Sequence, residues 1–165
     1  MQNLISGPIG LTHVISAIMA MSLGAIVLFK KRGTLAHKRL GYAYFASMLV
    51  LNITAFLIYR LFGRFGPFHW AALLSLTTLM MGFIPAILKK PKVNWIYYHM
   101  AGMYYSVVGL YSAFVSEVVT RIPGVPFFTI VAVATFIIFF GAVWWFQKYK
   151  EQWLRDAYPD QSKKM

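Results

Sequence analysis

The sequence contains no cysteine and only four acidic residues. Without cysteine, disulfides, thiolate metal sites and cysteine nucleophiles are all excluded. Charged residues make up 12% of the chain, against about 25% in soluble globular domains, whereas 59% of the residues are hydrophobic. A chain of 165 residues has too little interior to shield so much apolar surface from water. The composition therefore predicts a membrane protein.

Five apolar runs divide the chain, and each is close to the ~20 residues that cross the hydrocarbon core of a bilayer as a helix. They cover residues 9–29, 40–59, 68–88, 95–116 and 125–146. Short connections between the runs favour antiparallel packing of neighbouring helices. We expect an all-α membrane protein in which four transmembrane helices form an up-down bundle and a fifth packs outside it. This bundle would occupy residues 1–147, followed by a basic cytoplasmic tail over residues 148–165.

The net charge of +12 is unevenly distributed along the chain. Basic residues concentrate after the first run, after the third run and in the tail, whereas the other two connections carry few. Cytoplasmic loops of membrane proteins carry an excess of Lys and Arg. The distribution predicts a multi-pass protein of the inner (plasma) membrane with its N-terminus outside and its C-terminus in the cytoplasm. Because the charge lies between apolar runs, the expected partner is the lipid bilayer and not nucleic acid.

The four histidines fall on the first four predicted helices, one on each. His13 and His69 lie towards the outer side, and His37 and His99 towards the cytoplasmic side. In an up-down bundle, the first and third helices are diagonal neighbours, as are the second and fourth. We therefore expect an outer pair, His13 with His69, and an inner pair, His37 with His99. The inner pair requires the second helix to begin near Leu35, before its apolar run.

Two opposed imidazoles are the axial ligands of a bis-histidine b-type haem. Two such pairs, one above the other, would carry electrons across the membrane. Small residues that follow His13 (Ala17, Ala20, Gly24) and His99 (Gly102, Ser106, Gly109) at helical spacing would leave room for the macrocycle, although such stripes also serve helix–helix contact. The basic residues Lys31, Arg32, Lys38 and Arg39 lie near the inner pair, where they would contact propionates or an anionic reductant.

Two other readings of the histidines stay open. Imidazole is also a good ligand for Zn²⁺ and Cu, and Met100 and Met103 beside His99 would suit Cu(I), which favours a metal-binding or transport protein. Alternatively, the histidines are ordinary interface or core residues of a non-catalytic membrane subunit or assembly factor. The polar residues within the runs, such as Asn52, Thr54 and Thr77, are expected to form hydrogen bonds between helices.

The segment from Lys31 to Gly41, with its basic-Gly-x3-His-basic-x-Gly element, resembles the predicted bacterial membrane proteins of the domain-of-unknown-function family 2306 (DUF2306). His13 upstream and His99-Met100 downstream belong to the same resemblance, which covers the first four helices. It implies a prokaryotic inner membrane and a histidine at position 37 as part of the pattern. The topology of the paired histidines is similar to the four-helix core of the cytochrome b561 family, which implies a redox partner. A quinol or a cytoplasmic reductant as electron donor, and assembly in a membrane-protein complex or a homodimer, are left open.

Overall fold

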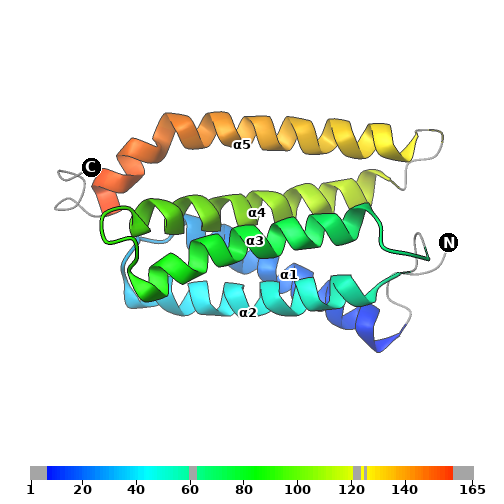
Figure 1. Ribbon diagram of the computed structural model, residues 1–165, viewed down its shortest axis with the longest axis horizontal. Coiled ribbons are helices and arrows are strands. Elements are labelled where there is room, and N and C mark those ends of the chain that lie inside the picture. Colours follow the sequence, from blue (N-terminus) through cyan, green and yellow to red (C-terminus); the bar gives the residue numbers. More distant parts are fainter. Residues whose placement is uncertain (1–6, 60–62, 121–123, 125, 158–165) are drawn as a thin grey trace.

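The computed structural model describes residues 7–59, 63–120, 124 and 126–157, and these form five helices with no strand among them (Figure 1). The helices are α1 (Pro8–Phe29), α2 (Leu35–Leu57), α3 (Pro67–Leu88), α4 (Trp95–Val119) and α5 (Phe127–Ala157). Proline opens α1 and α3, where the missing N–H needs no partner. The predicted all-α architecture of five helices is confirmed.

Two helices extend clearly beyond their apolar runs. α2 begins at Leu35, five residues before the apolar run, and α5 continues to Ala157, well into the predicted tail. In both cases polar and charged residues extend the helix beyond the part that hydropathy marks. The rest of the predicted tail, residues 158–165, lies outside the described residues.

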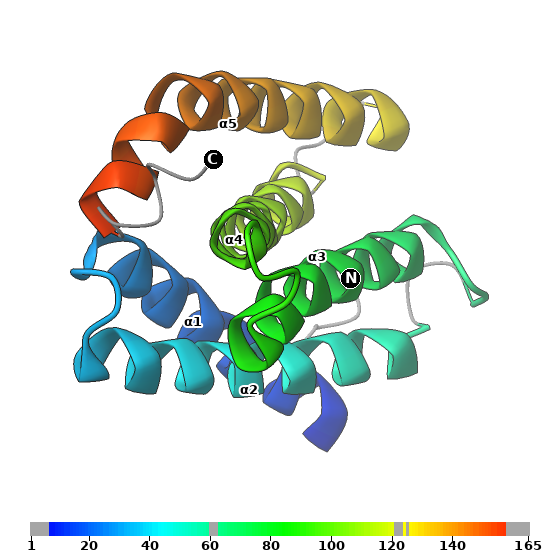
Figure 2. The same cartoon turned by 60° about the vertical axis from the view of Figure 1, so that its left-hand side comes forward.

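The first four helices form two antiparallel hairpins that lie side by side (Figures 1 and 2). α1 packs most extensively against α2, and α3 against α4, whereas α2–α3 and α1–α4 contacts are sparser. Among the helices, α5 packs mainly against α4, and its first residue, Phe127, has a ring contact with Phe68 of α3. The predicted core of four helices with a peripheral fifth is confirmed. The diagonal helices of the core are α1 with α3 and α2 with α4.

Tyr44 of α2 fills the centre of the core. Its ring lies against Gly24 of α1, where an added Cβ would approach Tyr44 Cε2 to 2.9 Å, and its hydroxyl is 2.9 Å from Ser106 Oγ of α4. The neighbouring side chains of Ala20, Met48 and Leu79 are completely buried. The small residues of α1 and α4 therefore make room for a tyrosine at this level of the bundle.

The backbones of α3 and α4 come into contact where Gly82 faces Gly102. A Cβ on Gly82 would lie 2.5 Å from the backbone nitrogen of Met103, so neither position has space for a side chain. Close approach of this kind is the common use of small residues in membrane helices. By contrast, a Cβ on Gly109, further along α4, would meet no atom within 4 Å.

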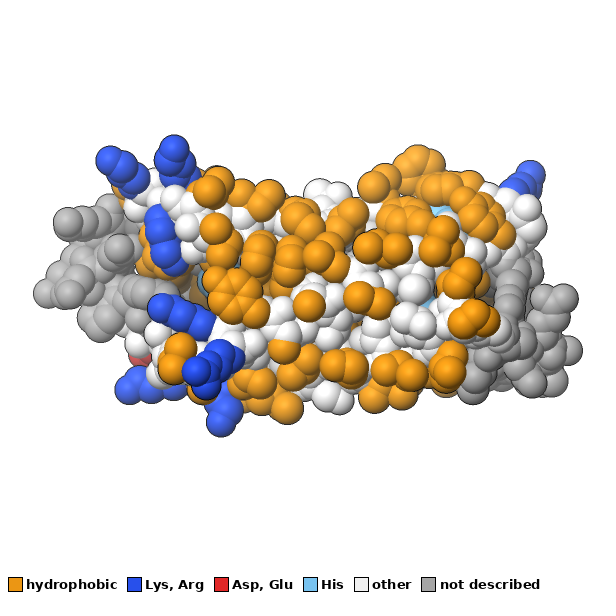
Figure 3. Space-filling view, turned by 90° about the horizontal axis from the view of Figure 1, so that it is seen from below, with side chains coloured by type: hydrophobic (Ala, Val, Ile, Leu, Met, Phe, Trp, Pro, Cys, Tyr) orange, Lys and Arg blue, Asp and Glu red, His pale blue; other side chains and the backbone are white. Residues whose placement is uncertain are grey.

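The exterior of the bundle is apolar along its length, and Lys and Arg side chains gather mainly at one end (Figure 3). α1, α2, α3 and α5 are long and apolar enough to cross a membrane. α4 is richer in tyrosine, serine and glycine. With 25 residues it is nevertheless at least as long as α1, α2 and α3, and it lies between α3 and α5 (Figure 1). Short connections join α4 to both of these neighbours, so we describe the chain as a multi-pass membrane protein.

Candidate functional site

The end of the bundle that carries most of the positive charge is called the basic end below. It contains the connections α1–α2 and α3–α4 and the last turns of α5 (Figure 1). Its described cations are Lys30, Lys31, Arg32, Lys38, Arg39, Lys89, Lys90, Lys92, Lys148, Lys150 and Arg155. The described carboxylates at this end are Glu151 and Asp156. Positive charge therefore greatly exceeds negative charge here.

His37 lies in the first turn of α2, at the basic end. Gly33 has a positive φ of 77°, which turns the chain, and Thr34 then caps the helix by accepting a hydrogen bond from His37 N–H at 3.2 Å. Threonine at this position satisfies one of the N–H groups that a helix start leaves unpaired. The cap includes His37 in the helix and leaves its side chain half-buried.

His99 lies in α4, slightly more than one turn from its start, also at the basic end. Its Nδ1 is 2.9 Å from the carbonyl oxygen of Gly82 in α3. A carbonyl oxygen only accepts, so Nδ1 carries the proton and Nε2 is left with a free lone pair. Histidine ligands of metals are commonly held in this tautomer by a backbone carbonyl. The close contact of α3 with α4 at Gly82 and Gly102 supplies this partner.

The rings of His37 and His99 have their centroids 6.4 Å apart and their planes at 86°. Each imidazole that binds a metal ion places a nitrogen about 2 Å from it, so two imidazoles on opposite sides have centroids roughly 6 to 6.5 Å apart. His37 Nδ1 is buried without a hydrogen-bond partner. One turn further along α2, a Cβ on Gly41 would meet no atom within 4 Å. The spacing and the unpaired nitrogen fit two imidazoles that would hold one metal centre, and the space at Gly41 is open.

Positive charge surrounds this pair. Arg32 is close enough to act electrostatically on both His37 and His99, and Lys89 acts on His99. Lys89 Nζ also lies 3.7 Å from the centroid of the Trp95 ring. Partial burial of its ammonium group, followed by repulsion from Lys38, lowers the pKa of Lys89. Of the predicted anionic contacts, Arg32 is therefore the one tied to both histidines, while Lys31, Lys38 and Arg39 are exposed around it.

The outer pair is arranged differently. His13 of α1 donates from Nδ1 to Thr54 Oγ1 of α2 at 3.0 Å, because the Thr54 hydroxyl itself donates to carbonyls of its own helix. His69 of α3 accepts at Nδ1 from Gly66 N–H at 3.1 Å, and its Nε2 is buried without a partner. No described contact joins His13 to His69. The outer ligand pair stays a prediction.

Two aromatic rings lie close to the ring of His69. Its ring centroid is 4.6 Å from that of Tyr59 and 4.8 Å from that of Phe65. Because Nδ1 accepts a hydrogen bond, the neutral ring carries its proton on Nε2. In this tautomer Nε2 has no lone pair for a metal, and His69 acts as part of the helix cap.

The polar residues within the helices form fewer interhelical bonds than predicted. Asn52 donates to Met48, Thr77 to Leu73 and Thr78 to Ser75, in each case to a carbonyl oxygen of the same helix. Ser16 and Ser22 do the same in α1. Thr54 is the exception, through His13. The prediction of interhelical bonds is therefore wrong for most of these residues, since a hydroxyl in a helix readily bonds the preceding turn.

Two contributors to the site were missed in the sequence. Gly82 acts through its backbone carbonyl, which no side-chain pattern reveals. The second is Trp153, in the predicted tail. Its ring centroid lies 5.2 Å from Cζ of Arg32, which is a cation–π contact. A signal for the second was present: Trp153 and Leu154 follow Phe146 at seven and eight residues, the spacing of one helix face. Phe146 and Leu154 are buried.

Replacing Thr34 by alanine is expected to lower the free energy of unfolding by about 1 kcal/mol, because the first turn of α2 loses its cap. Amide hydrogen exchange of His37 should become faster, since its N–H donates to Thr34. Denaturant titration in detergent and exchange measured by mass spectrometry would check both effects. Thr34→Ser retains the hydroxyl and should behave like the wild type. Equal losses in both variants would contradict the role of the cap.

Comparison with known proteins gives one family. The model of the family described as "Predicted membrane protein (DUF2306)" matches residues 10–149, which include all four histidines. No curated protein and no solved structure matches the chain.

Proposed function

The chain belongs to the DUF2306 family of predicted membrane proteins, and we propose that it is a membrane electron-transfer protein that holds a b-type haem between His37 and His99. The observation that carries this proposal is the spacing of the two imidazoles, 6.4 Å between centroids, on diagonal helices of the core. The proposed haem lies at the basic end. By the excess of positive charge there, this end faces the cytoplasm across an inner membrane, with the N-terminus outside.

The donor set favours haem over an isolated metal ion. Among the described residues, no group of three His, Asp or Glu side chains is placed to hold a metal, so the pair offers two ligands. A structural Zn²⁺ needs four ligands and a catalytic one needs three from the protein. A haem brings four nitrogens of its own and requires only axial ligands from the protein. When bound, it supplies an iron that changes oxidation state by one electron.

Each residue of the site has a defined part in this proposal. The Gly82 carbonyl fixes the His99 tautomer and leaves Nε2 for the iron. The Thr34 cap orients the turn that carries His37. Arg32 acts on both imidazoles, and its positive charge would stabilise carboxylate groups at the edge of the site. An anionic cytoplasmic reductant would be attracted to the same surface, and a quinol donor would reach the site from the bilayer.

The test is optical and paramagnetic spectroscopy of the purified protein, expressed with an adequate supply of haem. We expect Soret and α bands on reduction with dithionite, at one haem per chain. The oxidised protein should give the strongly anisotropic low-spin signal of axial imidazoles with perpendicular planes, as the 86° angle predicts. Two haems per chain would mean that His13 and His69 also hold one, with His69 in the tautomer opposite to the one that its hydrogen bond indicates. A colourless protein would overturn the proposal, and metal analysis would then distinguish a Zn²⁺ or Cu protein from a metal-free membrane subunit.

A further inference from the structure

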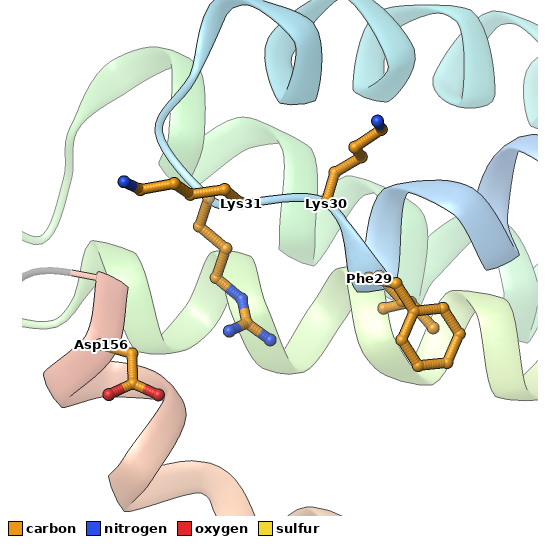
Figure 4. A pocket seen from close by; sticks show the side chains of 6 residues that line it. Phe29, Lys30, Lys31 and Asp156 are labelled. Atoms are coloured by element: carbon orange, nitrogen blue, oxygen red, sulfur yellow. The ribbon is translucent and has the colours of Figure 1, made fainter.

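A second candidate site lies at the basic end, where the last turn of α5 meets the connection between α1 and α2 (Figures 2 and 4). It is a pocket of about 160 Å³. Its lining residues are Leu28, Phe29, Lys30, Lys31, Arg32 and Asp156. Three cations and one carboxylate thus line the pocket, so its lining has a net positive charge. The side chains of Lys30 and Lys31 extend in different directions and not towards Asp156 (Figure 4).

Among the described residues of the basic end, eleven cations stand against two carboxylates, Glu151 and Asp156. Lys38 lies near enough to Lys89 to lower the pKa of its ammonium group, which indicates crowding of like charges at this end. The sequence holds only four acidic residues in all. An anion that enters the pocket is therefore attracted by the three cations that line the pocket and also by other cations at the basic end.

The pocket is also apolar on one side. Phe29, at the end of α1, is 91% exposed, and Leu28 precedes it. Figure 4 shows Phe29 beside Lys30 and Lys31, with Asp156 across from them on α5. α1 is one of the helices apolar enough to cross the membrane. Positive charge next to exposed apolar surface at the end of such a helix matches a molecule with an anionic head and an apolar tail.

The cation at the centre of this arrangement is held in place. The guanidinium group of Arg32 stacks over Trp153, whose ring lies 6.2 Å from that of Tyr149 at an angle of 19°. Arginine is suited to phosphate because its planar group donates two parallel hydrogen bonds. An arginine held by a ring loses less freedom when it binds than a free surface lysine does.

We propose that this pocket binds one anionic phospholipid, with its phosphate at Arg32 and its acyl chains along Leu28 and Phe29. The side chains of Lys30 and Lys31 extend in different directions beside it and add to the attraction of the headgroup. The pocket shares Arg32 with the proposed haem site, whereas Lys30 and the apolar lining belong to the pocket alone. Basic pockets at the cytoplasmic ends of membrane helices are suited to such headgroups. Asp156 opposes the bound charge and lowers the affinity for the anion.

The test is native mass spectrometry of the full chain in detergent, titrated with phosphatidylglycerol and with phosphatidylcholine of the same acyl chains. The wild type should bind one phosphatidylglycerol in preference to phosphatidylcholine. Lys30→Gln/Lys31→Gln, both exposed positions, should weaken binding by about 30-fold, from the contribution of each basic residue near a headgroup. Asp156→Asn should strengthen it, and Glu151→Gln, on the same helix outside the pocket, should not.

The matched control is Lys148→Gln/Lys150→Gln, which removes the same charge from the basic end outside the pocket. An equal loss of binding in this control would mean a general attraction to the basic end and would overturn the proposal. If phosphatidylcholine bound as tightly as phosphatidylglycerol, the pocket would not recognise the charge of the headgroup and the proposal would be overturned. Inorganic phosphate that binds as tightly as the lipid would identify a site for a free anion instead.

Discussion

Replacing Gly102 by alanine is expected to lower the free energy of unfolding of the bundle by about 1–3 kcal/mol, the usual cost of excess volume in a packed core. The added methyl group would overlap with the backbone nitrogen of Gly82 and lie 2.5 Å from its Cα. Backbone atoms of a helix cannot move aside as the end of a flexible side chain can, so α3 must shift away from α4. The same shift would weaken the hydrogen bond from His99 to the Gly82 carbonyl.

The matched control is Gly109→Ala on the same helix. A Cβ at Gly109 meets nothing within 4 Å, so the substitution retains only the better helix propensity of alanine, a gain of up to about 1 kcal/mol. Denaturant titrations in one detergent should show a lower free energy of unfolding for Gly102→Ala and a higher one for Gly109→Ala. If both were stabilised, the contact between α3 and α4 would be looser than described, and the position of His99 would need another explanation.

Substitution of His37 or His99 by alanine is expected to remove haem from the purified protein almost completely, to less than about a tenth of the wild-type content. In the proposed site, loss of either imidazole would leave the haem iron with one protein ligand in place of two. His13→Ala is the matched control, because its ring bonds to Thr54 at the opposite end of α1 and α2. Dithionite-reduced spectra of membranes with equal protein content would measure the loss.

The histidine variants are informative in each direction. Wild-type spectra from both His37→Ala and His99→Ala would refute the assignment of the ligands. Loss of haem in His13→Ala, with His99→Ala unaffected, would move the site to the outer end. A folding defect is detected separately by the unfolding transition, and His99→Gln, which retains a polar side chain of similar length, should fold like the wild type but bind no haem.

The arrangement of the helices could largely be predicted from the sequence, because hydropathy shows which segments are apolar enough to lie in lipid. Each apolar run is long enough for one crossing, and short connections leave antiparallel neighbours as the simple solution. The diagonal relation of α2 to α4 follows from this, and so does the approach of His37 to His99. The peripheral place of α5 was also expected, since the first four helices complete a bundle.

The remainder depended on interactions that hydropathy does not register. The start of α2 is set by Thr34, a cap within a charged segment, so the apolar run placed it five residues late. The partner of His99 is a backbone carbonyl, brought close by two glycines that the side-chain pattern does not pair. Trp153 packs against the bundle although it lies among charged residues of α5.

The packing of the core as two hairpins has a consequence for biogenesis. His37 belongs to the first hairpin and His99 to the second, so neither hairpin alone contains both. Chains are synthesised from the N-terminus at about 5–20 residues per second, so the two histidines enter the membrane one after the other. α5 follows last, and its final turns bring Trp153 onto Arg32 at the mouth of the site. Until α5 is in place, Arg32 therefore lacks its ring contact with Trp153, although both histidines have already been synthesised.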